Sequence, residues 1–326
     1  MKSEFSDLVK MLQGHKVYVQ THDFPDPDAI ASACGLQALL KWKGIDSTVV
    51  YFGLIDKINT KTIVDLLNIK LYSVEELREN MESDYVITVD GQKGNSNFSD
   101  LIGAEVACID HHPLTSKHRY RFMKHQLTGA CATIITKWIQ EEQMPLSKEL
   151  ATLLLYGIKM DTRNFMTGVT GNDIDAFSFL NEYADNNLIY QLDNSVLELA
   201  DLRAYASAIE NIAIYNEIGF SFIPFECPDG LIASVTEFIL SLSSVKLAIV
   251  YSERNGGLKF SVRSILPTVD CGKLTEKALK GIGSGGGHYS MAGGFIPKES
   301  MYILGEGTTR DRILQECFIR ALENKR

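Results

Sequence analysis

The feature that most constrains the fold is a regular alternation of strand-like and helix-like segments through the first half of the chain. Short β-branched and apolar runs occur at 16–21, 47–52, 84–90 and 105–109. Helices are expected at 4–13, 28–43, 58–68, 73–82, 129–142 and 147–160. Because parallel strands need a crossover connection, usually a helix, this alternation predicts an α/β fold, a parallel sheet with helices on both faces.

The second half of the chain is organised differently. The stretch from about 171 to 212 is helical and polar, and a proline-containing break follows at 224–230. The apolar segment 220–225 leads into this break, and beyond it we expect strands at 246–252, 258–264 and 293–296, helices at 231–242 and 270–280, and a glycine run at 281–287. At 326 residues the chain suits two domains. We expect a first domain at 1–190, a helical linker at 191–218 and a smaller α/β domain at 219–326.

The charge balance limits the class of partner. The chain has 32 Lys and Arg against 41 Asp and Glu, a net charge of −9, which does not suit a protein that binds duplex DNA without sequence preference. Residues 231–326 carry 13 basic and 9 acidic residues, so the acidic excess lies in 1–230. This split suits a first part that holds cations and a second part that grips an anion, and random surface charge explains it equally well.

Cysteine usage and hydropathy indicate the compartment. The six cysteines are scattered without a CxxC pair, which fits a reducing environment better than a disulfide framework or a zinc knuckle. No stretch approaches 18 uncharged apolar residues, and acidic residues near the first Met disfavour a signal peptide. We expect a cytoplasmic protein without a membrane partner.

Acidic and histidine residues gather where the predicted strands end. They are His22, Asp26, Asp28, Asp90, Asp110, His111 and His112, with Asp161 at the end of a helix. Carboxyl ends of parallel strands share one edge, where ligands bind. An Asp at a strand end is by itself more often a helix N-cap or a turn former, so the indication comes from the whole set. An oxygen-rich set with few imidazoles favours Mn²⁺ or Mg²⁺, and two ions sharing a carboxylate could clamp a phosphoryl group.

These residues lie in motifs that resemble a known family. The segments HDFPDPDA from His22, Asp90 at a strand end, DHH at 110–112 and GIKMDT at 157–162 resemble the four ordered motifs of the DHH phosphoesterases. The segments GGGH at 285–288 and MAGG at 291–294 resemble the glycine motif of the associated C-terminal domain, DHHA1. In size and layout the chain is similar to the branch of bifunctional oligoribonucleases (nano-RNases) and pAp phosphatases.

The resemblance implies two Mn²⁺ ions per subunit, with Mg²⁺ or another divalent metal as alternatives. One ion would be held by His22, Asp26 and Asp90, and the second by Asp28, Asp90, His111 and Asp161. Asp110 would orient His111, and His112 would face the phosphate or assist proton transfer to the leaving oxygen. The substrate contacts from the second domain would be Arg263, Ser264, Gly285, Gly286, Gly287 and His288.

The residue types of the second domain support this assignment. Successive glycines let the backbone approach a ligand and present free N–H groups as an anion nest. A flexible hairpin is the alternative for the glycine run, and for Arg263 it is the solvated face of a strand.

The resemblance and the ligand set favour a Mn²⁺-dependent phosphoesterase of short nucleotides (nano-RNA, linear dinucleotides, pAp), with a metal-activated water as nucleophile. A cleft between the two domains would admit a short single strand or a mononucleotide bisphosphate and exclude a duplex. A homodimer is common among proteins of this layout. One departure concerns the substrate: segment 91–97 (GQKGNSN) lacks the small hydroxyl or thiol residue and the arginine found there in many nano-RNases.

Three other functions remain open. An inorganic pyrophosphatase or polyphosphatase would share the first-domain motifs but not the GGGH segment. A non-catalytic nucleotide-binding relative would be expected to lose ligands, and all of them are present here. A processive exonuclease would need an additional strand-binding domain, for which this chain has no spare length.

Overall fold

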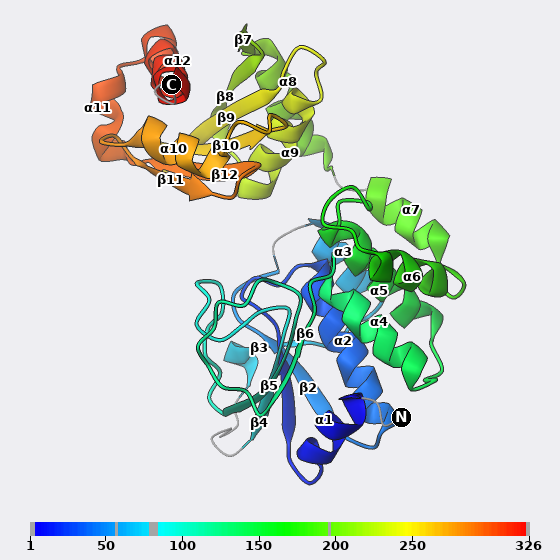
Figure 1. Ribbon diagram of the computed structural model, residues 1–326. Coiled ribbons are helices and arrows are strands. Elements are labelled where there is room, and N and C mark those ends of the chain that lie inside the picture. Colours follow the sequence, from blue (N-terminus) through cyan, green and yellow to red (C-terminus); the bar gives the residue numbers. More distant parts are fainter. Residues whose placement is uncertain (1–3, 56–57, 78–83, 195–196, 324–326) are drawn as a thin grey trace. The chain divides into compact units, whose positions relative to one another are not determined.

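The computed structural model describes residues 4–55, 58–77, 84–194 and 197–323, and the chain divides into two compact units, Met1–Val196 and Leu197–Arg326 (Figure 1). Each unit contains one six-stranded sheet. Among the described residues, no helix combines the length and the apolar character that crossing a membrane requires.

Unit 1 is built on a parallel sheet, as the sequence predicts. Its strands are β1 (Val17–Gln20), β2 (Ser47–Tyr51), β3 (Tyr72–Ser73), β4 (Tyr85–Val89), β5 (Ala104–Asp110) and β6 (Phe122–His125). They lie in the order β3-β2-β1-β4-β5-β6, and every neighbouring pair is parallel. The direction of strand addition therefore reverses between β1 and β4. This switch point is where open α/β sheets bind their ligands.

The helices of unit 1 build the larger of its two cores. They are α1 (Glu4–Leu12), α2 (Pro27–Trp42), α3 (Ile58–Leu66), α4 (Cys131–Glu141), α5 (Lys148–Asp161), α6 (Gly171–Asn181) and α7 (Asn186–Asn194). Buried side chains of α2, α4 and α5, including Leu36, Ile135 and Leu154, pack with strand residues such as Val19. Tyr18, Val50 and Val86 point to the opposite face, where a smaller cluster includes Val74 of the 3₁₀ helix η1 (Val74–Glu76).

A glycine lets α5 approach α2. A Cβ atom at Gly157 would lie 2.9 Å from the Cβ of Ala31 and 3.2 Å from the Cα of Asp28, so a side chain would push the two helices apart. The close approach brings the C-terminal residue of α5, Asp161, toward the first turn of α2. The packing of two helices thus supplies one wall of the site described below.

Unit 2 has a mixed sheet. Its strands are β7 (Ala213–Tyr215), β8 (Ile218–Glu226), β9 (Leu247–Arg254), β10 (Gly257–Ser264), β11 (Ser284–Gly287) and β12 (Met291–Ile296), in the order β11-β12-β10-β9-β8-β7. Only β8 and β9 pair in parallel. The helices are α8 (Leu202–Glu210), α9 (Asp229–Leu240), α10 (Cys271–Leu279), α11 (Met301–Leu304) and α12 (Gly307–Glu323), with 3₁₀ helices η2 (Leu199–Asp201) and η3 (Lys298–Ser300). Helices α10 and α12 share one core with the sheet, and α8 and α9 share the other.

The structure differs from the sequence expectations in several elements. The helix expected at 73–82 is a strand end followed by η1, because the Ser73–Glu76 capping box closes a single 3₁₀ turn; 78–82 lies outside the described residues. The strands β3, β6, β7 and β11 were not expected, and the segment 220–225, expected only to lead into a break, lies in β8. In the segment 191–218, where a linker is expected, the structure has α8 and β7, and Ala204 and Ala208 of α8 are buried in a core of unit 2.

Candidate metal centre

The six predicted ligands meet at the carboxyl edge of the unit 1 sheet. His22 follows β1, Asp90 follows β4, and His111 follows β5. Asp26 and Asp28 lie at the start of α2, and Asp161 ends α5. Because β1 and β4 are neighbours at the switch point, His22 and Asp90 come together although more than sixty residues separate them. The convergence that the sequence indicates is therefore present in the fold.

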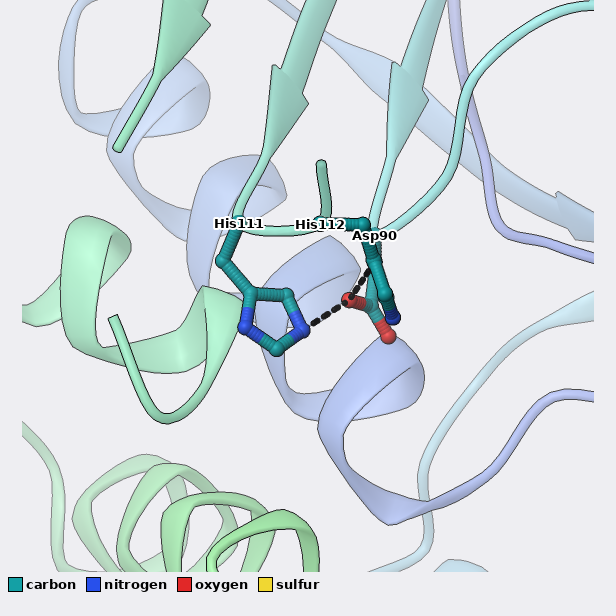
Figure 2. A group of neighbouring side chains, drawn as sticks. All are labelled: Asp90, His111 and His112. Carbon is teal, nitrogen blue, oxygen red and sulfur yellow. Dashed lines mark ion pairs between the residues drawn. The ribbon is translucent and has the colours of Figure 1, made fainter. Parts of the chain in front are cut away.

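The ligand atoms form three overlapping groups, each with atoms within 4.8 Å of one another. The groups are His22–Asp26–Asp90, Asp28–His111–Asp161 and Asp90–His111–His112. The first two correspond to the two ion sites implied by the family resemblance. Figure 2 shows the third, in which both histidine side chains lie beside the Asp90 carboxylate.

Asp90 is at the centre of this arrangement. Its carboxylate is 3% exposed, with Oδ2 3.7 Å from His22 Nε2 and Oδ1 3.3 Å from His111 Nε2. The residue has a φ of +57°, a left-handed conformation that non-glycine residues seldom adopt and that commonly marks a functional constraint. It turns the chain at the end of β4, with its own N–H donating to Ile109 O at 3.0 Å.

The backbone orients the two inner histidines. His111 Nδ1 lies 2.9 Å from Thr128 O, and His22 Nδ1 lies 2.8 Å from Asp23 O. A carbonyl oxygen only accepts hydrogen bonds, so in each ring Nδ1 carries the proton and, in the neutral form, Nε2 presents a lone pair. Both Nε2 atoms face carboxylates. This is the outer hydrogen bonding typical of metal-bound imidazoles.

Two buried atoms at this point test whether the residues suit a cation. Among the described residues, His111 Nε2 and Asp90 Oδ1 are buried and make no hydrogen bond, although they lie only 3.3 Å apart. His111 Nε2 is also 3.3 Å from Asp161 Oδ2. Buried polar atoms normally have partners, and an electron-rich nitrogen facing two carboxylates calls for positive charge between them. The donor set therefore fits a divalent cation.

The electrostatics of the cluster lead to the same conclusion. Burial raises the pKa of Asp28 well above its ordinary value, and the neighbouring Asp90 and Asp161 carboxylates raise it further. Burial and the Asp90 carboxylate raise the pKa of Asp161 to about 6. Burial lowers the pKa of His111, but the Asp90 carboxylate outweighs it and raises the pKa to about 11. Without a metal, the clustered carboxylates are relieved by protons, a role that a bound cation would take over.

The aspartates of α2 also hold the local structure. Asp26 Oδ1 accepts from the N–H groups of Asp28 and Ala29 and so caps α2. The Asp28 oxygens accept from the N–H groups of Cys131 and Ala132 at 2.7 and 2.9 Å, which caps α4 from a neighbouring helix. These aspartates thus cap helices, as aspartates at such positions commonly do. Each carboxylate oxygen has a second lone pair, so the same side chain could also bind a metal ion.

Asp110 contacts a different ring from the one that the resemblance implies. Its Oδ1 accepts from His112 Nδ1 at 2.9 Å and from the His111 backbone N–H at 2.9 Å, whereas the ring of His111 is held by Thr128 O. Sequence reasoning missed Thr128, since a backbone carbonyl leaves no signal in residue type. It noticed Gln92 only as part of a divergent segment, and in the structure Gln92 Nε2 donates to Asp110 Oδ2 at 2.6 Å.

The glycine run of unit 2 forms a strand rather than a loop. Gly285, Gly286 and Gly287 belong to β11, which pairs with β12. A Cβ at Gly285 would lie 2.6 Å from the Thr275 side chain, so the absence of side chains lets α10 pack closely on this edge. The expectation of an anion nest with successive free N–H groups is therefore wrong for the paired part of the run.

The remaining substrate candidates lie near one end of this sheet. Arg263 pairs with Met291, whose carbonyl accepts from the His288 N–H at 2.7 Å, so Arg263 and His288 lie on adjacent parts of the sheet. The Arg263 side chain is 15% exposed, with Nε 3.6 Å from Glu237 Oε1, while His288 is exposed. The Ser264 hydroxyl donates to Lys246 O and accepts from the Leu266 N–H, so it stabilises the strand end.

Comparison with known proteins supports this reading of unit 1. Residues 16–158, which hold five of the six predicted ligands, match the family model described as the DHH family, N-terminal domain. Asp161, the sixth predicted ligand, lies three residues beyond the matched part.

Curated relatives cover different shares of the chain. An uncharacterised protein of Methanocaldococcus jannaschii is 28% identical over 318 residues, 94% of this chain and 65% of that protein. A probable manganese-dependent inorganic pyrophosphatase of Bacillus pumilus is 32% identical over 185 residues, 55% of this chain and 59% of that protein. The chain thus spans less than two thirds of the length of these relatives.

Solved structures have a similar fold. An exopolyphosphatase-related protein from Bacteroides fragilis superposes with a TM-score of 0.76 at 21% identity, covering 98% of this chain and 96% of that chain. RecJ in complex with Mn²⁺ from Thermus thermophilus gives a TM-score of 0.54 at 16% identity, covering 96% of this chain and 54% of that chain. At these identities the similarity is one of fold.

Proposed function

We propose that this protein is a divalent-metal-dependent phosphoesterase, with Mn²⁺ as the metal, that hydrolyses phosphate ester bonds of short nucleotides. The observation that carries the proposal is the pair of buried atoms, His111 Nε2 and Asp90 Oδ1, that face each other without a hydrogen bond at the sheet's switch point. Relatives named as manganese-dependent enzymes support the choice of metal.

The residues divide the work as follows. His22, Asp26 and Asp90 would hold one ion, and Asp28, Asp90, His111 and Asp161 the second. Bound there, the ions would supply an activated water and neutralise the phosphate charge. His112, whose side chain is 48% exposed, lies at the exposed side of the cluster and would meet the substrate. Arg263, Ser264, Gly285, Gly286, Gly287 and His288 of unit 2 remain the candidates for binding the rest of the nucleotide.

Product analysis tests the substrate class. Mn²⁺-loaded protein is incubated with pAp, pApA, a cyclic dinucleotide, a five-nucleotide RNA and pyrophosphate, and products are separated by chromatography. We expect pApA and the short RNA to yield mononucleotides and pAp to lose a phosphate. If chelation of the metal left this hydrolysis intact, the proposal would be wrong.

An inorganic pyrophosphatase is the second candidate, because the Bacillus pumilus relative that matches about half of this chain carries that name. It predicts that pyrophosphate is consumed faster than any nucleotide in the same mixture. Unit 2 favours the first candidate, since residues 231–326 are net basic and present Arg263 near the exposed His288. Substitution of Arg263 should then weaken nucleotide turnover more than pyrophosphate turnover.

A further inference from the structure

Gln92 is a buried amide that uses its full hydrogen-bonding capacity. Its side chain is 0% exposed. Nε2 donates to Asp110 Oδ2 at 2.6 Å and to Pro113 O at 3.2 Å, and Oε1 accepts from the N–H groups of Thr115 and Ser116 at 3.0 Å each. An amide offers two N–H donors and one oxygen with two lone pairs, so all four positions are occupied.

A buried amide with four hydrogen bonds is not needed merely to fill this volume. Burying an amide is unfavourable unless every bond is made, and a methionine of similar length would fill the same volume without that requirement. We therefore look for the role of the amide in the groups to which it hydrogen-bonds. Its partners are the Asp110 carboxylate, itself 0% exposed, and the loop 113–116 that directly follows His112.

Asp110 connects Gln92 to His112 by hydrogen bonds. While Oδ2 accepts from Gln92, Oδ1 accepts from His112 Nδ1 at 2.9 Å and from the His112 backbone N–H at 3.3 Å. A carboxylate held on both oxygens cannot rotate freely, so the plane of the His112 ring is set by Gln92 through Asp110. Since Nδ1 is committed to Asp110, Nε2 is the ring nitrogen that a substrate can meet.

We propose that Gln92 is a positioning residue that orients His112 through Asp110. The oriented ring would protonate the leaving oxygen of phosphoesters whose alkoxide is a poor leaving group, such as that of a sugar hydroxyl. This inference rests on the proposed function. The water oxygen forms the new P–O bond and releases a proton to solvent, while the ester P–O bond breaks and its electron pair goes to the leaving oxygen. That oxygen takes the Nε2 proton of a doubly protonated His112 ring, which leaves the neutral ring with its proton on Nδ1, and Nε2 regains a proton from solvent.

Leaving-group dependence separates positioning from a merely structural role. Gln92→Met is compared with wild type on pApA and on a 4-nitrophenyl ester of a nucleoside 5′-phosphate, whose leaving group needs no proton. We expect kcat on pApA to fall about 10- to 100-fold, the usual effect of losing an outer hydrogen-bond partner, and kcat on the 4-nitrophenyl ester to change little. Gln20→Met is the matched control, because Gln20 is also 0% exposed and donates to Ser99 O at 2.6 Å. It should leave the ratio of the two rates unchanged.

Equal losses on both esters, or the same change of ratio in Gln20→Met, would overturn the inference. A second measurement does not depend on turnover: the imidazole ¹H–¹⁵N spectrum of the diamagnetic Mg²⁺-loaded protein. For His112 we expect the proton of the neutral ring to reside on Nδ1 in wild type and to be shared between both nitrogens in Gln92→Met. An unchanged spectrum would also count against Gln92. If wild type hydrolysed neither ester, the proposed function would fail while the spectrum still decided whether Gln92 orients His112.

Discussion

At the scale of single residues, the decisive feature is the direction in which each histidine presents its nitrogens. The rings of His22 and His111 are held through Nδ1 by backbone carbonyls, and their Nε2 atoms converge on Asp90. His112 differs, because its Nδ1 is held by the side chain of Asp110. Two rings thus present Nε2 to the candidate metal centre, and the third, for which we propose contact with the substrate, is held by a side chain, although all three are histidines at strand ends.

Replacing Asp90 should abolish activity without enlarging or shrinking the site. Asp90→Asn keeps the shape of the side chain but removes the charge that two histidines and both predicted ions share. We expect turnover of pApA with Mn²⁺ to fall by more than about 100-fold, beyond the effect of losing an outer partner. Asp100→Asn is the control, since Asp100 lies in the following segment and is 60% exposed. Substantial turnover by Asp90→Asn would contradict the proposed ligand role.

The sequence could predict which candidate ligands converge but not their surroundings. Acidic and histidine side chains at strand ends leave a pattern, and the strand order brings the pattern together. The Thr128 carbonyl leaves no such signal, and the buried state of Gln92 could not be read from the polar segment in which it occurs. Asp110 was assigned to the wrong ring, because adjacent histidines in a chain cannot be distinguished without side-chain orientation.

At the scale of elements, long periodic segments were predicted well and short ones were not. The alternation of strands and helices predicts the parallel sheet because α2, α4 and α5 are long enough to show their pattern, whereas β4, β5 and β6 follow one another without a helix between them. Strands β6, β7 and β11 have three or four residues and owe their structure to a neighbour. Glycine-rich β11 is a strand only because β12 pairs with it and α10 packs over it.

The contact between α2 and α5 should not tolerate a methyl group. Gly157→Ala adds a carbon 2.9 Å from the Ala31 side chain, and we expect a loss of about 1–3 kcal/mol in the free energy of unfolding despite the better helix propensity of alanine. Urea denaturation measures the change. Gly171→Ala at the start of α6 has open space around the new carbon and should be neutral or stabilising. Equal effects would mean that the close approach of the helices carries no packing constraint.

The start of α9 should make the stability of unit 2 depend on pH. Burial raises the pKa of Asp229, but Lys259 and then Arg254, each 2.8 Å from its carboxylate, outweigh it and hold the pKa below its ordinary value. A lowered pKa in the folded state adds stability above the unfolded-state pKa of about 3.9, which is lost as the pH falls through the lower folded value. Asp229→Asn should therefore lower the melting temperature at pH 7, and the difference from wild type should vanish in acid.

Added salt provides the control for this pH effect. The Asp229 side chain is 56% exposed, so its ion pairs are open to screening, and the difference at pH 7 should shrink as ionic strength rises. A difference that persists unchanged at low pH would contradict the assignment of the effect to the charge of Asp229.

At the scale of the whole molecule, the two units should respond differently to metal. The candidate ligands all lie in unit 1, so Mn²⁺ should raise the melting temperature of this unit. Binding adds about 2.7 kcal/mol to the free energy of unfolding when the Mn²⁺ concentration is one hundred times the dissociation constant. Hydrogen exchange should slow in peptides around 20–30, 88–92 and 108–113 and stay unchanged through 219–296 when metal is added alone. Asp90→Asn should remove the effect. No shift with saturating Mn²⁺ would count against a preformed site.

The strand order has a consequence for how this protein matures. The candidate ligands are distributed from His22 to Asp161, and the neighbours at the switch point, β1 and β4, are joined through the two strands that lie on the other side of β1. During synthesis no short stretch of nascent chain can assemble the cluster, because its first and last members, His22 and Asp161, lie far apart in the sequence. Ion uptake would then be a late event, and its kinetics would report the moment at which the first unit closes.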